Sequence, residues 1–201
     1  MDSLTENIRR AVENSPNGVA RLETLESLQL CDKFTLKTTL SRLCKSHRII
    51  RLKRGVYSSN PIRDMFIAAQ CTYNGYIGFS SALYVHKLIA ELSFTVTVVT
   101  TYKSASSTIG AYEFRAIAMK EKAIGFETVG ELTVSTRAKT LFDCLYLERY
   151  SIEKDKLIEA YKLARLSSDE LREFNSYVKR FVSKGRRAKF NMIEEEIASK
   201  G

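Results

Sequence analysis

The chain has 201 residues, of which 44% are hydrophobic, and a formal net charge of +9. This apolar share is enough for a packed core and excludes a disordered chain. The longest apolar runs, such as residues 94–99, have the length of a strand, and the N-terminus shows no signal-peptide pattern. We therefore expect a cytoplasmic protein with no membrane partner.

The cysteines show no arrangement that is typical of disulfide or metal-binding pairs. Cys31, Cys44, Cys71 and Cys144 lack CxxC spacing, and two of them fall inside apolar helical patterns. A free cysteine in such a pattern behaves as a small hydrophobic residue. We interpret all four as reduced, structural thiols and expect neither a bound metal nor a cofactor.

The basic residues are concentrated toward the two ends of the chain. Residues 1–60 carry 11 Lys/Arg against 6 Asp/Glu, residues 61–150 carry 9 against 8, and residues 151–201 carry 12 against 9. Between Lys33 and Arg54 there are eight basic residues and no acidic residue. A surface of one sign attracts polyanions, of which nucleic acid is the commonest, although it can also serve solubility alone.

Three helices are predicted in the N-terminal part. Apolar residues at helical spacing predict helices over residues 4–12 and 22–28, with a turn-rich segment at 14–18 between them. A third helix is predicted over about 35–46, with Thr35 as its N-cap.

The third helix has two different faces. On a helical projection, Leu36, Leu40, Leu43 and His47 form the side that we expect to be buried. The opposite face carries Lys37, Thr38, Ser41, Arg42 and Lys45. Short polar and cationic side chains on one face suit a helix that lies in the major groove of DNA.

A basic hairpin is predicted directly after this helix. Two β-rich runs within residues 49–57 flank a turn that ends in Gly55. Arg51, Lys53 and Arg54 would lie beside the helix and hold phosphates or enter the minor groove. Residues 1–60 are therefore predicted to be a winged helix-turn-helix domain that binds double-stranded DNA. The alternative is a winged helix that contacts other proteins.

Residues 61–201 are predicted to form a second domain, so the fold class is α+β: a winged helix-turn-helix followed by a mixed α/β domain with a helical C-terminal tail. The first predicted elements are a helix from Pro61, a strand over 75–79, a helix from Ser80 to about Ile89 and a strand over 94–101. A Ser/Thr-rich loop over 103–109 follows, then strands over 112–119 and 124–129 and a helix from Ser135 or Thr136 to Tyr150. The tail is helical from Ile152 onward, with amphipathic stretches over 153–165 and 169–184.

Three blocks in this order carry a resemblance to a known family. They are residues 53–57 (KRGVY), residues 75–88 (GYIGFSSALYVHKL) and residues 134–145 (VSTRAKTLFDCL). Together they resemble the AbiE antitoxin family, the regulatory half of abortive-infection toxin–antitoxin pairs. The family usually has a proline near Arg137 and an arginine where Lys139 stands. The resemblance covers about residues 30–150, and the tail after residue 150 matches in helical character only.

The resemblance implies two roles. The winged helix would repress the promoter of its own operon, with the operator as its DNA partner. The remainder would counteract a toxin that is similar to a nucleotidyltransferase, and this family is described as acting without a stable complex. The chain would then be a transcriptional regulator and antitoxin in phage defence, and not an enzyme.

The sequence gives less support to an enzymatic function. No phosphate-binding glycine loop or nucleophile elbow is present. His47 and His86 lack neighbours at ligand spacing and are interpreted as structural. A metal-dependent nuclease, the weakest alternative, would need Glu113, Glu127 and Asp143 to converge. Asp143 is expected to form a structural salt bridge instead, with Arg137 or Lys139.

Two further segments leave alternatives open. Residues 104–108 (SASST) are interpreted as a mobile loop whose hydroxyls could also contact phosphate. Residues 184–189 (KGRRAK) place four cations within six residues. We interpret this basic segment as a solvated surface, with a second DNA contact as the alternative.

Overall fold

The computed structural model describes residues 3–91 and 93–198. The chain forms two compact units, one made of Met1–Asn74 with Thr108–Tyr112 and the other of Gly75–Ser107 with Glu113–Gly201. The predicted domain division lies between residues 60 and 61, whereas the units divide after Asn74. Within the described residues, no helix is long and apolar enough to cross a membrane.

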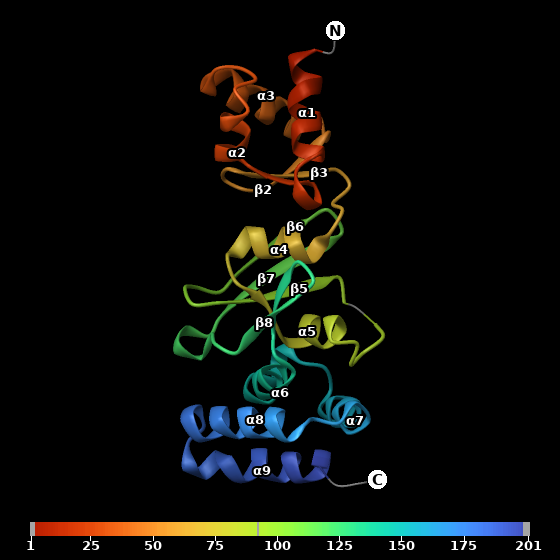
Figure 1. The fold of residues 1–201 in the computed structure, drawn as a ribbon, viewed down its shortest axis with the longest axis vertical. Helices are drawn as coiled ribbons and strands as arrows, with labels where there is room; N and C mark the ends of the chain where they lie inside the picture. Colours follow the sequence, from red (N-terminus) through yellow and green to blue (C-terminus); the bar gives the residue numbers. More distant parts are fainter. Residues whose placement is uncertain (1–2, 92, 199–201) are drawn as a thin grey trace. The chain divides into compact units, whose positions relative to one another are not determined.

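The first unit combines helices with a three-stranded antiparallel sheet in the order β1-β3-β2 (Figure 1). Its elements are α1 (Leu4–Glu13), a 3-10 turn (Pro16–Gly18), β1 (Val19–Arg21), α2 (Leu22–Ser27), α3 (Lys33–Lys45), β2 (Ile49–Lys53), β3 (Val56–Ser59) and α4 (Met65–Tyr73). The three predicted N-terminal helices and the hairpin are confirmed by this order.

The core of the first unit is built from the apolar faces of these elements. The buried residues that pack together are Ile8, Val12, Ala20, Leu25, Leu36, Leu40, Leu43, Ile49 and Tyr57. Helix α3 contributes every third or fourth residue, so its predicted inner face of three leucines is confirmed. This burial fixes which side of α3 points outward.

Three local predictions in this unit are wrong. Helix α3 begins at Lys33 because Asp32, and not Thr35, caps it. His47 lies beyond the end of α3, is exposed and has a left-handed φ of 55°, so it does not share the buried face. Helix α4 begins at Met65 with Asp64 as its cap, and not at Pro61, which follows a cis peptide bond.

The second unit contains most of a mixed sheet in the order β6-β7-β5-β4-β9-β8. Its strands are β4 (Tyr76–Ile77), β5 (Thr95–Thr100), β6 (Ala105–Ile109), β7 (Tyr112–Ala118), β8 (Phe126–Val129) and β9 (Leu132–Ser135). Strand β4 pairs antiparallel with β5 and parallel with β9, while β5 and β7 are parallel. The predicted α+β class is therefore correct.

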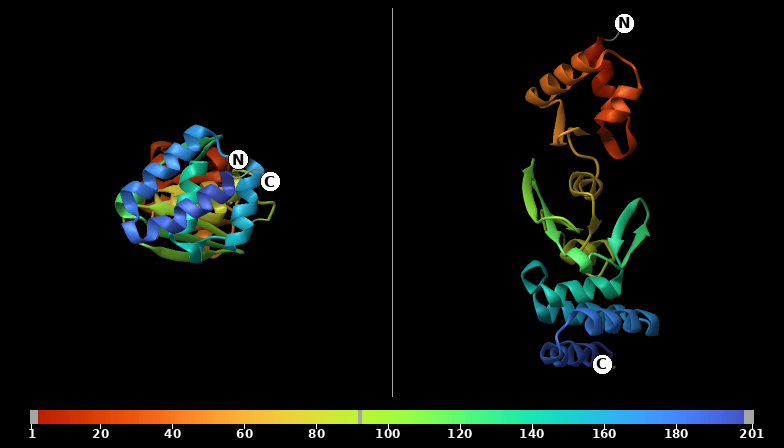
Figure 2. Two further views of the ribbon diagram at one scale, coloured as in Figure 1. Left: turned by 90° about the horizontal axis from the view of Figure 1, so that it is seen from below. Right: turned by 90° about the vertical axis from the view of Figure 1, so that its left-hand side faces the viewer.

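Helices cover this sheet in layers. They are α5 (Phe79–Val85), α6 (Arg137–Tyr146), α7 (Lys154–Ala164), α8 (Ser168–Phe181) and α9 (Lys184–Ala198), with 3-10 turns at Lys120–Lys122 and Glu148–Tyr150. Figures 1 and 2 show α6 between the sheet and α8, with α9 on the far side of α8. A single apolar cluster runs through these layers from Phe79 and Val99 to Phe142, Phe174 and Phe190.

The prediction from the sequence misplaced or missed several elements of the second unit. Part of the predicted loop over 103–109 is strand β6, and strand β9 was not predicted. Helix α5 begins at Phe79 and ends at Val85, well before Ile89. The basic segment 184–189 forms the first turns of α9, within the tail that was predicted to be helical from Ile152 onward.

Candidate nucleic-acid interface

Helix α3 presents a polar, cationic face to solvent. Its start is fixed by Asp32, whose carboxylate accepts hydrogen bonds from the backbone N–H groups of Phe34 at 2.9 Å and Thr35 at 3.0 Å. These bonds satisfy two of the amides that a helix N-terminus leaves without partners. The predicted outward residues Lys37, Ser41, Arg42 and Lys45 are exposed, and Thr38 is half-buried.

Most of the eight basic residues between Lys33 and Arg54 have no acidic partner. Among the residues that the structure describes, only two members form ion pairs, Lys33 with Glu26 at 3.0 Å and Arg48 with Glu6 at 2.6 Å. The remaining cations are Lys37, Arg42, Lys45, Arg51, Lys53 and Arg54. No carboxylate of the described residues neutralises their charge, which is therefore available to a polyanion.

The hairpin of β2 and β3 carries three of these cations on or near its turn. The turn consists of Arg54 and Gly55, and Gly55 has the left-handed φ of +78° that favours glycine. The Gly55 carbonyl accepts a hydrogen bond from the Leu22 N–H at 2.8 Å, which ties the turn to α2. Arg51 and Arg54 are exposed.

Lys53 differs from the two arginines of the hairpin. It is half-buried, and its Nζ donates a hydrogen bond to Oδ1 of Asn74 at 3.3 Å. Burial lowers the pKa of Lys53. The Lys53 ammonium group thus already has a hydrogen-bond partner within the first unit. Arg51 and Arg54 are therefore better placed than Lys53 to contact phosphates.

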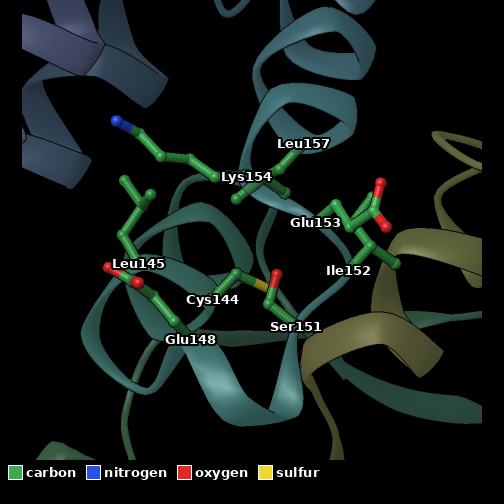
Figure 3. A pocket seen from close by; sticks show the side chains of 8 residues that line it. All are labelled: Cys144, Leu145, Glu148, Ser151, Ile152, Glu153, Lys154 and Leu157. Atoms are coloured by element: carbon green, nitrogen blue, oxygen red, sulfur yellow. The ribbon is translucent and has the colours of Figure 1, made fainter.

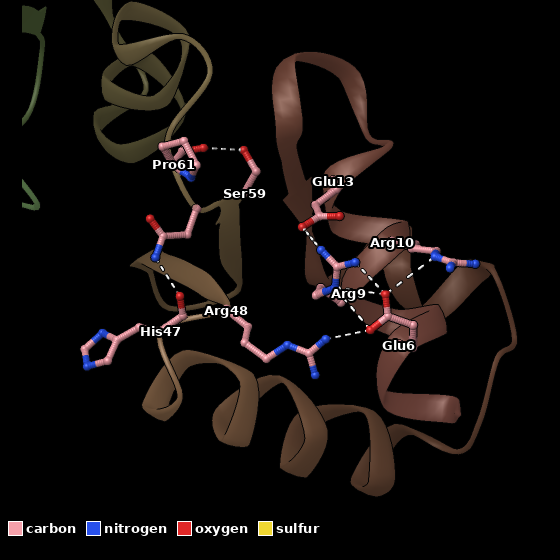
Figure 4. A network of polar contacts seen from close by, with 9 residues as sticks. Glu6, Arg9, Arg10, Glu13, His47, Arg48, Ser59 and Pro61 are labelled. Carbon is pink, nitrogen blue, oxygen red and sulfur yellow. Dashed lines mark hydrogen bonds and ion pairs between the residues drawn. The ribbon is translucent and has the colours of Figure 1, made fainter. Parts of the chain in front are cut away.

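An ionic network links α1 to Arg48, which lies shortly after the end of α3 (Figure 4). Glu6 pairs with Arg9 at 2.5 Å, Arg10 at 3.5 Å and Arg48 at 2.6 Å, and Arg9 also pairs with Glu13. The hydrogen bond from Arg9, followed by that from Arg48, lowers the pKa of Glu6 to about 2. The cations of α1 are therefore balanced by carboxylates, unlike Lys37, Arg42 and Lys45 of α3.

One residue on the outward face of α3 was missed by the sequence analysis. Phe34 lies in the first turn of the helix and is 81% exposed. It was overlooked because the predicted helix began at Thr35. Extending the helical projection by one turn would have placed Phe34 above Lys37 and Thr38.

The core of the second unit contains a buried ion pair. Lys139 Nζ donates a hydrogen bond to Asp143 Oδ1, and both side chains have no exposed surface. The predicted salt bridge of Asp143 is confirmed, with Lys139 as the partner. Burial raises the pKa of Asp143 to about 6 and lowers the pKa of Lys139. Because a substrate cannot reach either group, the pair is structural in this conformation.

The carboxylates considered for a metal site are not brought together. Glu113 on β7 accepts hydrogen bonds from Arg115 at 2.7 Å and from Thr95 at 3.0 Å. Glu127 lies on β8, and three strands separate β7 from β8 in the sheet. No group of three His, Cys, Asp or Glu side chains within residues 3–91 and 93–198 could hold a metal ion. His86 contacts the Ser135 carbonyl through Nε2 at 2.7 Å.

A small cavity of about 190 Å³ lies beside α6 and the start of α7 (Figure 3). Cys144, Glu148, Ser151 and Lys154 contribute to its lining, and Figure 3 shows the Cys144 sulfur next to Ser151. Burial raises the pKa of the Cys144 thiol to about 12, so the reactive thiolate is disfavoured. The cavity therefore offers no activated nucleophile.

Comparisons with known proteins provide no identification. No protein-family model matches the sequence, and a search of curated proteins finds no match.

Proposed function

We propose that the first unit is a winged helix-turn-helix that binds double-stranded DNA, with α3 as the recognition helix. The observation that carries this proposal is the unneutralised cationic face of α3 beside the basic β2–β3 hairpin. The order helix, strand, two helices and a hairpin supports the proposal, because winged helices share it. A helix of this width fits the major groove, and each phosphate contact adds affinity through counterion release.

The proposed contacts fall into two groups. The residues of α3 that would contact the base edges or hold the helix beside them are Lys37, Thr38, Ser41, Arg42 and Lys45. Arg51 and Arg54 on the hairpin would hold phosphates, with Lys53 in a lesser role because it is partly buried. In this division the hairpin positions the protein on the duplex and α3 supplies sequence preference.

We further propose that the chain is a cytoplasmic transcriptional regulator and antitoxin that represses its own operon and counteracts a nucleotidyltransferase-like toxin. The resemblance to AbiE antitoxins supports this role. Its second and third blocks, distant in sequence, meet in the second unit: Ile77 of β4 pairs with Val134 of β9, and His86 contacts the Ser135 carbonyl.

A reporter assay in cells tests the regulatory role. The full-length protein is expressed with its own upstream DNA fused to a reporter gene. We expect wild type to repress the reporter and Arg42→Ala to lose most of that repression. Arg172→Ala is the matched control, because Arg172 is an exposed arginine of α8 in the second unit. Equal repression by wild type and Arg42→Ala would contradict the assignment of the α3 face.

If a nucleotidyltransferase-like gene lies next to this one, co-expression of the two tests the antitoxin role separately. Arg42→Ala is expected to rescue growth as well as wild type when both are expressed from a foreign promoter. Loss of rescue in this variant would show that neutralisation requires DNA binding. Failure of wild type to rescue would overturn the antitoxin proposal and leave the DNA-binding proposal to the reporter assay.

A further inference from the structure

Phe34 is an anomaly on the surface of the first unit. It is 81% exposed on a helix whose three leucines are at most 1% exposed. On a helical projection, Phe34, Ser41 and Lys45 lie along the middle of the outward face, opposite Leu36, Leu40 and Leu43. A large aromatic ring thus lies at the N-terminal end of a helix face that is otherwise polar and cationic.

The fold itself gives no reason for a phenylalanine at this position. The start of α3 is held by the Asp32 carboxylate through the backbone of Phe34 and Thr35, so the ring is not needed for the cap. The ring belongs to neither the core of the first unit nor any aromatic or cation–π contact in the described residues. Exposed apolar groups of this size are more typical of a binding surface than of a bare helix.

The surroundings of Phe34 favour DNA over a protein partner. Lys37 lies one turn from Phe34 on the same side of α3, and a protein interface centred on Phe34 would have to bury this lysine, which interface cores disfavour. In helix-turn-helix proteins the N-terminal residues of the recognition helix contact base edges. Phe34 occupies the first turn of α3, where such contacts are made.

We propose that Phe34 contacts the 5-methyl group of thymine in the major groove and thereby selects thymine at one position of the DNA site. The thymine methyl is the one apolar group that a base edge presents in the major groove, and phenylalanine is among the side chains that contact it. This inference rests on the proposed DNA-binding function and adds to it the kind of base that is read.

Replacing thymine by deoxyuridine tests the contact, because uracil lacks only the methyl group. The full-length protein first selects a preferred duplex from a random pool, and each thymine is then replaced singly. At one thymine, or two in a symmetric site, wild type is expected to lose affinity by on the order of four-fold, the effect of about one buried methyl group.

The Phe34→Ala variant completes a double-mutant cycle. It is expected to bind the thymine duplex as weakly as wild type binds the matching uracil duplex, or more weakly, and to lose nothing further at that position. Phe94→Ala is the control, since Phe94 is a 72% exposed phenylalanine of the second unit. This control variant should keep the full sensitivity to the methyl group.

Three results would overturn the inference. If Phe34→Ala binds like wild type and keeps the uracil effect, another residue reads the methyl group. If Phe34→Ala instead binds DNA normally but changes the oligomeric state in sedimentation, Phe34 serves a protein contact. If wild type selects no preferred duplex, the proposed DNA-binding function fails together with the thymine contact. In the first two results DNA binding remains intact, so failure of the thymine contact alone can be distinguished from failure of DNA binding. The unfolding temperature of Phe34→Ala should equal that of wild type, because the ring is exposed.

Discussion

The first unit gathers exposed cations on one helix face and the neighbouring hairpin, whereas the second unit buries one ion pair in its core. On α3 and the β2–β3 hairpin, cations such as Arg42 and Arg54 are exposed and have no acidic partner in the described chain. In the second unit Lys139 is fully buried against Asp143. Arg137 donates to the Ala164 carbonyl at the end of α7, and Arg187 donates to the carbonyls of Lys179 and Val182.

This difference shows that the number of charges in a segment does not define its role. The run from Lys33 to Arg54 and the basic segment 184–189 are both rich in cations. In the basic segment, however, Arg187 caps backbone carbonyls and Lys189 pairs with Glu148. A cation that already has a partner gains less from a phosphate, so the first unit is the stronger candidate for DNA binding.

The largest expected effect comes from breaking the buried pair. Lys139→Met leaves Asp143 buried without its partner, and we expect the free energy of unfolding to fall by about 3–5 kcal/mol. Urea denaturation measures this loss. The double variant Lys139→Met/Asp143→Leu should recover much of it because no lone charge is left in the core.

Lys189→Met is the matched control for the buried pair. Its partner Glu148 is about half exposed, and pairs of this kind contribute about 0–1 kcal/mol. A loss for Lys139→Met that is as small as the loss for Lys189→Met would contradict the structural role assigned to the buried pair.

The next effect concerns sequence preference on α3. If Arg42 makes a bidentate base contact, Arg42→Ala should weaken binding to the preferred duplex by about 1–3 kcal/mol and change binding to a scrambled duplex much less. Fluorescence anisotropy with both duplexes measures the two affinities. An equal loss on both duplexes would reassign Arg42 to the phosphate backbone.

The hairpin provides a smaller and less selective effect. Arg54→Ala should weaken binding to all duplexes alike and reduce the slope of log K against log salt by about one unit. Lys53→Ala should reduce this slope by less, because Lys53 Nζ is partly buried and donates to Asn74. If Lys53→Ala has the larger effect, the side chain leaves Asn74 when DNA binds.

The smallest effect is the pH dependence of the α1 network. The pKa of Glu6 is lowered from 4.5 to about 2, mainly by its hydrogen bond with Arg9. A depressed carboxylate pKa gives stability that is present above about pH 4.5 and is lost as the pH falls toward 2. Glu6→Gln should therefore show a shallower fall in unfolding free energy across this window. Identical pH profiles would mean that the network contributes nothing to folding.

Much of the first unit could be predicted from the sequence because local patterns define it. The spacing of Leu36, Leu40 and Leu43 indicates the inner face of α3, and a glycine between two β-rich runs indicates the hairpin. The cap was misassigned because Thr35 and Asp32 are both residues that favour an N-cap. That three-residue error also hid Phe34.

The second unit was harder to predict because long-range packing determines it. Strand β6 has the composition of a loop and is formed through its place beside β7. Strand β9 is only four residues long; it forms a local hairpin with β8 and also pairs with β4, which comes from a distant part of the chain. The i,i+4 spacing of Lys139 and Asp143 predicts a salt bridge, whereas their complete burial depends on the aromatic residues of α8 and α6.

The most direct test of the central claim is the salt dependence of DNA binding. Fluorescence anisotropy of the full-length protein is measured with its own upstream DNA and with a scrambled duplex over a salt series. The account predicts tighter binding to the upstream DNA and a log K that falls with log salt by at least about 3 units per decade, the slope of three to four phosphate contacts. Weak binding that is equal for both duplexes and unchanged in Arg42→Ala and Arg54→Ala would contradict it.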